Sequence, residues 1–151
     1  MQVKDFMIRK VYTVNPTNSI KDLLVILQKN QIGGVPVVDD DNHLIGIISD
    51  GDVLRYLSPN PVAGLADLVY IIEDGKMEDV LREKLQTKVK AIMRKRNIVK
   101  VPPDENFETA IRILSKHHFK KLPVVDDAGR VVGVLSRGDI INNIAAKMIG
   151  E

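Results

Sequence analysis

Two serine–aspartate pairs in the sequence have residue types and a spacing that could bind a small polar ligand. Ser49 precedes Asp52 by three residues, and Ser136 precedes Asp139 by the same interval. Each pair follows a short apolar run, where we expect a helix to begin and to offer free amides and partial positive charge. A carboxylate there can accept two hydrogen bonds from a vicinal diol such as a ribose. The alternative is that each pair is only a capping box, which needs no ligand.

Basic residues accompany only one of the two pairs. Lys120 and Lys121 lie before the second pair, whereas Gly33 and Gly34 occupy the aligned positions before the first. Lysine ammonium groups can bind phosphate as point charges. The alternative is a solvated lysine pair at a strand edge. We therefore expect two unequal sites, with phosphate-binding charge in the second one only.

The elements that must position these residues occur twice. When the chain is displaced by 87 positions, residues 14–57 align with residues 101–144 without a gap. Short β-branched runs bounded by Pro, Asp and Gly are typical of strands, and the polar stretch between them has hairpin length. The predicted order in each unit is β-α-β-β-α, which makes the fold class α+β. Because half of the chain cannot easily cover its own sheet, the two units should pack on each other with pseudo-two-fold symmetry.

The predicted boundaries are 1–57 for unit 1, 58–88 for an insert and 89–151 for unit 2. For unit 1 we expect a turn or short helix at 3–7, a strand at 10–14, a helix from 18 or 19 to 29 ended by the two glycines, two strands, and a helix ending near 57. For unit 2 we expect a strand at 98–101, a helix at 106–117, two strands, and a helix at 137–148. In the insert, residues 65–73 should pack on the module or dock a partner, and residues 77–93 should form one helix.

The amino-acid composition excludes some classes of function and argues against others. The chain has 151 residues, 44% of them hydrophobic, so one compact core or two small joined cores is expected. It has no cysteine, which excludes disulfides and thiolate metal sites. His117 and His118 are neighbours whose side chains would not converge on a metal. With no apolar run of membrane-spanning length and no signal peptide, we expect a cytoplasmic protein. A net charge of +2 and 4% aromatic residues argue against nucleic acid as a partner.

The doubled pattern resembles a tandem pair of CBS (cystathionine β-synthase) domains, often called a Bateman module. The resemblance is carried by Pro-Val-Val-Asp followed by Gly, two apolar residues and Ser-x-x-Asp in both units, and it covers nearly the whole chain apart from the insert. It implies two clefts between the units that bind AMP, ADP, ATP, S-adenosylmethionine or related adenosyl ligands. It also implies a regulatory role, no required cofactor, and dimerisation of the pair.

The resemblance assigns residues to both clefts, each of which borrows residues from the first strand of the opposite unit. The main cleft is expected to use Ser136, Arg137, Gly138, Asp139, Lys120, Lys121, Leu122, Pro123, Ile8, Val11, Tyr12 and Thr13. The second cleft is expected to use Ser49, Asp50, Asp52, Gly34, Val35, Pro36, Arg94 and Ile98. The sequence departs from the family in one respect: Met-Ile and Met-Arg stand where many members have Met-Thr, so a hydroxyl contact is missing from both clefts.

Two functions follow as hypotheses. The first is a sensor that binds an adenosyl ligand and signals to an unidentified protein partner. The second is a structural or partner-docking module whose clefts are degenerate and bind nothing. We expect no enzyme, because the sequence has no cysteine nucleophile, no Ser/His/Asp arrangement and no phosphate-cradling P-loop. We expect a homodimer, because the last helix should carry an apolar face that a second copy could cover, formed by Ile140, Ile141, Ile144, Ala145 and Met148.

Overall fold

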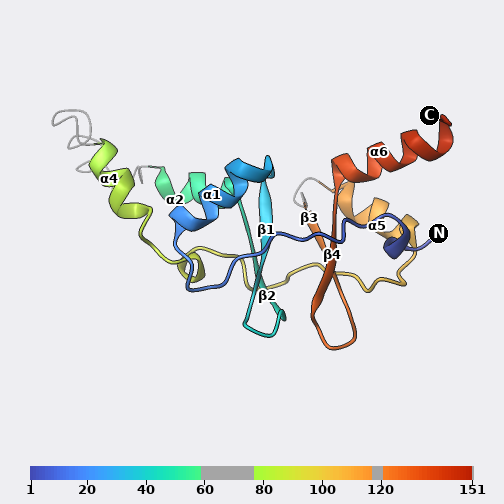
Figure 1. The fold of residues 1–151 in the computed structure, drawn as a ribbon, viewed down its shortest axis with the longest axis horizontal. Helices are drawn as coiled ribbons and strands as arrows, with labels where there is room; N and C mark the ends of the chain where they lie inside the picture. The colour runs from blue at the N-terminus through green and yellow to red at the C-terminus, as the bar shows by residue number, and fades with distance from the viewer. Residues whose placement is uncertain (59–76, 117–120, 151) are drawn as a thin grey trace.

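The computed structural model describes residues 1–58, 77–116 and 121–150, and its mixture of helices and strands confirms the α+β class (Figure 1). The elements in chain order are η1 (Val3–Asp5), α1 (Ile20–Asn30), β1 (Gly34–Val38), β2 (Leu44–Ser49), α2 (Asp50–Leu57), α4 (Met77–Lys84), η2 (Val89–Ala91), α5 (Phe107–Leu114), β3 (Lys121–Val125), β4 (Val131–Ser136) and α6 (Arg137–Met148). The repeat in the sequence is therefore a repeat in the structure.

Two antiparallel hairpins form the centre of the molecule. Strand β1 pairs with β2 and strand β3 pairs with β4, and each hairpin has an irregularity at the same place, near its turn. In Figure 1 the hairpins lie side by side, with α1 and α2 on one outer flank and α5 and α6 on the other. Strands β1 and β3 are buried along nearly their whole length, and their apolar side chains lie in hydrophobic cores shared with these helices, as short β-branched runs favour.

Polar side chains fix where the helices begin. The side chains of Ser19, Ser49 and Ser136 each accept a hydrogen bond from the backbone N–H three residues on. In return, the serine N–H donates to the carboxylate at that third position. These are complete capping boxes, each of which satisfies two otherwise unpaired amides. Helix α5 is capped more simply, by the Asn106 side chain. Both Ser-x-x-Asp pairs therefore cap helices.

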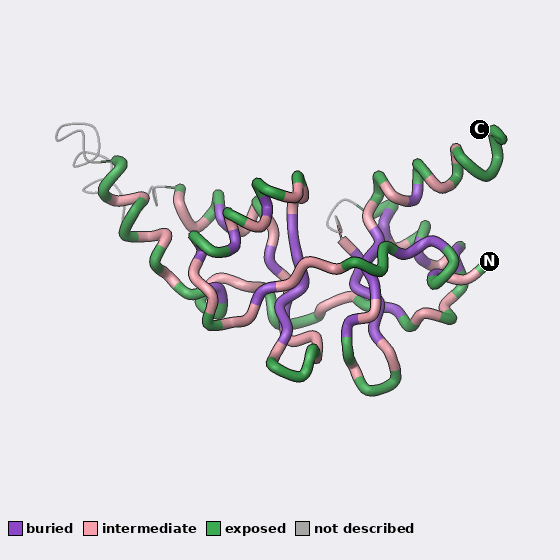
Figure 2. The backbone as a smooth tube through the Cα atoms, viewed as in Figure 1, coloured by how far each residue is buried: buried purple, intermediate pink, exposed green. Residues whose placement is uncertain are grey.

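Each hydrophobic core is completed by the first residues of the other unit. The N-terminal residues Val3, Phe6 and Met7 are buried in the core that contains α5, β3 and β4. Conversely, Val89 is buried among the residues of α1, β1 and β2. The chain crosses between the two halves at residues 8–14 and again at residues 94–101, and buried segments lie in both halves (Figures 1 and 2). Neither half is closed without this exchange.

Two glycines make the exchange possible. A Cβ on Gly133 in β4 would lie 2.8 Å from Cγ and 3.2 Å from Cβ of Met7, in addition to a closer approach to its sulfur. A Cβ on Gly46 in β2 would lie 2.8 Å from Sδ of Met93 and 3.0 Å from the Arg94 carbonyl oxygen. A methionine from each crossing segment therefore lies directly on a strand backbone where only glycine leaves enough room.

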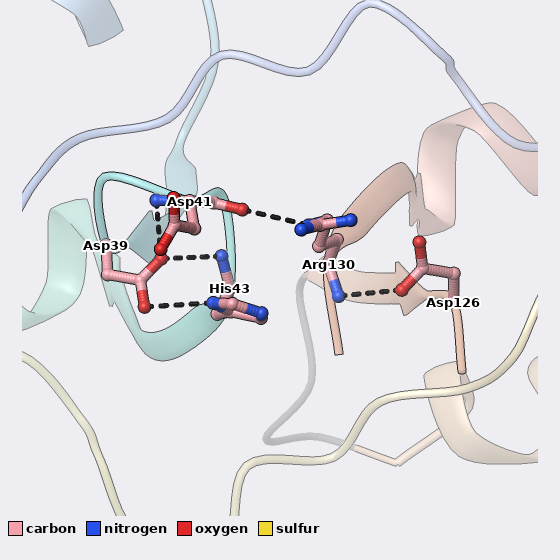
Figure 3. A network of polar contacts seen from close by, with 5 residues as sticks. All are labelled: Asp39, Asp41, His43, Asp126 and Arg130. Atoms are coloured by element: carbon pink, nitrogen blue, oxygen red, sulfur yellow. Dashed lines mark hydrogen bonds and ion pairs between the residues drawn. The ribbon is translucent and has the colours of Figure 1, made fainter. Parts of the chain in front are cut away.

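The two hairpin turns are joined to each other (Figure 3). The Leu44 N–H donates to the Gly129 carbonyl at 3.0 Å, the Val131 N–H donates to the Asn42 carbonyl at 3.0 Å, and Arg130 Nε donates to the Asp41 carbonyl at 3.2 Å. A small apolar cluster lies beside this junction, formed by Val38, Val125 and Val131 with Val11 and Leu44 against it. The turns thus connect the two units at one end of the hairpins.

The strands predicted at 10–14 and 98–101 are wrong in extent. Only one residue of each makes a bridge: Val14 pairs in parallel with Val37, and Val101 pairs in parallel with Val124. Pro16 follows two residues after the first bridge and Pro102 directly after the second. Because proline has no N–H to donate, neither ladder continues after its bridge. The residues before each bridge do not pair either, because they lie in the segments that cross between the two halves.

Two further predictions need correction. The helix predicted at 77–93 ends at Lys84, because the Thr87 carbonyl accepts from the Ile20 N–H at 2.8 Å and the Leu85 carbonyl accepts from the Lys21 N–H at 3.0 Å. The chain leaves the helix there to satisfy the free amides of α1. The predicted glycine cap of α1 is also wrong, since the cap is Gln31 with a left-handed φ of 53°.

Several predictions lie outside the described residues: the apolar segment at 65–73, the pair His117 and His118, and Lys120. Among the helices that the structure does describe, none has the length and apolar character needed to cross a membrane. The cytoplasmic location stays a prediction of the sequence.

Candidate functional site

The carboxylate of Asp139 uses one of its two oxygens to cap α6. Its Oδ2 accepts from Ser136 Oγ at 2.7 Å and from the Ser136 N–H at 3.2 Å. Within the described part of the chain, Oδ1 has no hydrogen-bond partner. Both residues are only half-buried. Helix capping therefore leaves one acceptor oxygen, held in a fixed orientation at a helix N-terminus, for a second interaction.

Two basic residues belong to this position, which we call the unit-2 site (Lys121, Ser136, Arg137, Asp139 and Asn142). Lys121 opens β3 directly opposite Ser136 in the antiparallel register. Arg137 has a different role from the one expected, because its Nε donates to the Leu114 carbonyl at 2.8 Å and its Nη2 donates to the Lys116 carbonyl. Its guanidinium thus satisfies carbonyls at the C-terminal end of α5 and ties α5 to the start of α6.

The equivalent unit-1 site (Gly34, Ser49, Asp50, Asp52 and Arg55) differs in charge and in hydrogen bonding. Asp52 Oδ2 accepts from the Ser49 N–H at 2.9 Å and from Ser49 Oγ at 3.1 Å, as in the other unit. Its Oδ1, however, accepts from Arg55 Nη2 at 2.7 Å. Asp50 stands where Arg137 stands in unit 2, and Gly34 stands where Lys121 does. The unit-1 site is therefore the more acidic of the two.

Both crossing segments begin beside the strand that leads to a Ser-Asp pair. Ile8 and Val134 exchange backbone hydrogen bonds of 2.9 and 3.0 Å, and Val134 lies two residues before Ser136. Arg94 and Ile47 exchange bonds of 2.9 Å, two residues before the first serine. Ile8 thus lies beside the strand that ends at the unit-2 site, and Arg94 lies beside the strand that ends at the unit-1 site.

The other predicted site residues lie at the hairpin junction, against the core or in the buried parts of the strands. Val11 packs at the hairpin junction, Tyr12 packs against the core of unit 1, and Thr13 and Ile98 are half-buried. The side chains of four residues are buried: Val35, Pro36, Leu122 and Pro123. In addition, the carbonyls of Pro36 and Pro123 accept from Val14 and Val101. These buried residues shape the strands rather than present side chains at the surface, and Gly138 lies exposed in the first turn of α6.

Sequence reasoning missed Arg55. The residue lies three positions after Asp52, which is a spacing that brings two helical side chains together, so the pair could have been found from the sequence. The aligned residue in unit 2 is Asn142, which is uncharged and makes no hydrogen bond to Asp139 among the described residues. Among those same residues, no group of three or more His, Cys, Asp or Glu side chains could hold a metal ion.

The comparisons with known proteins identify the family. The model of the CBS domain matches residues 3–59 and 89–146. An uncharacterized protein of Methanocaldococcus jannaschii, MJ1426, is 35% identical over 158 residues, covering 93% of this chain and 89% of its own length. The chloroplastic CBS domain-containing protein CBSX2 of Arabidopsis thaliana is 31% identical, with 92% of this chain and 61% of that protein covered.

Solved structures of CBS domain pairs are also similar to this chain. The crystal structure of CBSX2 in complex with AMP is similar with a TM-score of 0.72 and 28% identity, covering 99% of this chain and 98% of that one. The CBS domain pair of protein MJ0100, in complex with 5′-methylthioadenosine and S-adenosyl-L-methionine, is similar with a TM-score of 0.73 and 26% identity, covering 97% and 98%. The chain belongs to the CBS domain family and contains two CBS domains in tandem, as the doubled motif predicted.

Proposed function

We propose that this protein is a regulatory module that binds an adenosyl ligand, with the ribose at Asp139. The observation that carries the proposal is the geometry of that carboxylate, whose capping bonds to Ser136 occupy one oxygen while the other has no partner among the described residues. A ribose diol needs such an acceptor, and a hydrogen bond to a charged group contributes about 1.5–3 kcal/mol. The complexes of CBSX2 with AMP and of MJ0100 with S-adenosyl-L-methionine support the ligand class.

The charges of the unit-2 site favour a phosphorylated ligand there. Lys121 lies opposite Ser136 in the strand register, so a basic residue stands on the strand next to the residue that caps α6. The unit-1 site has Gly34 in that place and the acidic Asp50 at the start of its helix. AMP, ADP or ATP should therefore bind the unit-2 site more tightly than the unit-1 site, because phosphate is attracted to the first and repelled by the second.

The competing function is a structural or partner-docking module with empty clefts. The complete capping boxes at Ser49 and Ser136 favour it to the extent that both aspartates already have a structural role. The two functions differ in one measurable property, which is whether a ligand stabilises the folded state. The proposed sensor also needs a protein partner through which it signals, and it acts without catalysing a reaction itself.

A thermal-shift screen tests the proposal. The wild-type protein is heated with AMP, ADP, ATP, S-adenosylmethionine or 5′-methylthioadenosine, and with inosine monophosphate as a matched purine control. A ligand that binds only the folded state should stabilise it by about 2.7 kcal/mol at a concentration one hundred times its dissociation constant. Stabilisation by an adenosyl ligand supports the sensor. No stabilisation by any of them at millimolar concentration leaves the docking module as the better account.

A further inference from the structure

The two sites differ in one contact that decides how a diol can reach the aspartate. Arg55 Nη2 lies 2.7 Å from Asp52 Oδ1, the oxygen that helix capping does not use. In unit 2 the aligned residue is Asn142, and Oδ1 of Asp139 has no partner within the described residues. The second acceptor oxygen is therefore occupied in unit 1 and available in unit 2.

A second observation concerns the space over the first turn of each helix. A Cβ built on Gly51 in α2 would lie 3.3 and 3.6 Å from the two terminal nitrogens of Arg55. A Cβ built on Gly138 in α6 would have only Ser136 Oγ, at 4.0 Å, within reach among the described residues. The guanidinium thus lies across the first turn of α2, whereas the first turn of α6 is open.

We propose that Arg55 is the residue that sets the affinity of the unit-1 site, by holding the Asp52 carboxylate and covering the helix N-terminus against the vicinal diol of a nucleoside. The inference rests on the proposed function, since it assigns the diol to these aspartates. A nucleoside must displace the guanidinium before it can bind at Asp52, and it meets no such competitor at Asp139. The helix position that holds Arg55 in unit 1 and Asn142 in unit 2 is then a specificity-determining position of the repeat.

The exposure of the Arg55 side chain limits how much its ion pair can change ligand affinity. The Arg55 side chain is 70% exposed, and ion pairs of this kind contribute at most about 1 kcal/mol. That free energy corresponds to about fivefold in affinity. The ion pair between Arg55 and Asp52 is therefore weak enough for a ligand to displace Arg55. The pair is also sensitive to salt, because exposed charges are screened.

The test exchanges the two residues and uses adenosine, which has the diol and no phosphate. Calorimetric titrations are carried out on the full chain as wild type, Arg55→Asn and Asn142→Arg. The matched control is Arg82→Asn, because Arg82 is also 70% exposed and paired with a carboxylate, that of Glu78 on α4. We expect Arg55→Asn to tighten the weaker site about fivefold, Asn142→Arg to weaken the tighter site by a similar factor, and the control to change neither.

Salt provides a second readout. At about 1 M salt, where the Debye length is about 3 Å, the weaker site of the wild type should tighten for neutral adenosine, while Arg55→Asn should show no such gain. Two equal sites in the wild type, or a weaker site that Arg55→Asn leaves unchanged or weakens further, would overturn the inference alone. No adenosine binding by the wild type or by either exchange variant would overturn the proposed function and this inference with it.

Discussion

At the scale of single residues, one carboxylate can have two roles at once. Asp139 caps α6 through Oδ2, so the capping and ligand-binding interpretations of its Ser-x-x-Asp motif do not exclude each other. The cap fixes the side chain before any ligand arrives, which lowers the entropy cost of ordering it on binding. The same carboxylate geometry recurs at Asp52, where an arginine occupies the other oxygen. The difference between the sites therefore comes from the residues next to the serine and aspartate rather than from that pair itself.

The lysine pair Lys120 and Lys121 should discriminate between phosphorylated and unphosphorylated ligands. We expect the double change Lys120→Ala and Lys121→Ala to weaken AMP by about 1.5–3 kcal/mol, the range for hydrogen bonds to charged groups. Adenosine affinity should stay the same, because the ammonium groups have only phosphate to bind. Titration calorimetry with both ligands measures this. An equal loss for adenosine would contradict the assignment, and Lys29→Ala on the exposed surface of α1 is the control.

Among the helices and strands, the sequence predicted those features that depend only on residues close by in the chain. The caps at Ser19, Ser49 and Ser136 and the end of α2 at Leu57 follow from motifs within a few residues. The single-residue bridges and the early end of α4 at Lys84 could not be predicted in the same way. They depend on hydrogen bonds between distant segments, such as that from Ile20 to the Thr87 carbonyl. For the candidate site, the sequence predicted that Asp52 and Asp139 lie at helix N-termini with unequal charge nearby, but not how Arg55 and Arg137 are used.

The crossing of the N-terminal segment over β4 gives a prediction about packing. Gly133→Ala should destabilise the protein by about 1–3 kcal/mol, the usual cost of overpacking, because the new methyl group meets Cγ and Cβ of Met7. Chemical denaturation measures the change. The cost should shrink in a Met7→Ala background, since the clash is with that side chain.

The equivalent change in the other unit is the matched comparison. Gly46→Ala meets both Met93 and the backbone carbonyl of Arg94, so its cost should persist when Met93 is shortened to alanine. Equal rescue in both units would show that the backbone contact does not matter. Full additivity in the Gly133 and Met7 cycle would contradict the proposed role of the crossing segment.

The first hairpin turn makes stability depend on pH. The backbone N–H of His43, above all, holds the pKa of Asp39 below its ordinary value of 3.8, with the N–H of Asp41 adding to the effect. A lowered folded-state pKa stabilises the protein above the unfolded value, and this contribution is lost as pH falls through 3.8 toward the folded pKa. Asp39→Asn should therefore flatten the acid side of a stability–pH profile. The same change at its exposed neighbour Asp40 is the control, and an equal effect there would contradict the assignment.

At the scale of the whole molecule, an apolar surface remains after the two units have packed on each other. On α6 the exposed side chains include Ile141 (64%), Ile144 (37%) and Met148 (69%), whereas Ile140 is buried in the core of its own unit and is not available to a partner. Exposed apolar residues gathered on one element are typical of interaction surfaces. We propose that a second copy of the chain covers this face.

Light scattering tests the assembly. The wild type at micromolar concentration should have the mass of a dimer, twice 16.9 kDa. Ile141→Glu should shift it toward the monomer, because a charge would be desolvated in the interface. Glutamate at Val25, an exposed position on α1, is the comparison. A wild-type monomer at these concentrations would contradict the proposal.

The proposed binding of an adenosyl diol by Asp139 is tested by calorimetric titration of AMP and adenosine into wild type and Asp139→Ala. The variant should lose about 1 kcal/mol of stability with the cap and remain folded. If the account is correct, both ligands bind the wild type and both lose about 1–3 kcal/mol of affinity in the variant, as expected when a hydrogen bond to a charged group is removed. If the folded variant binds AMP as tightly as the wild type does, the ribose is not at Asp139 and the account is contradicted.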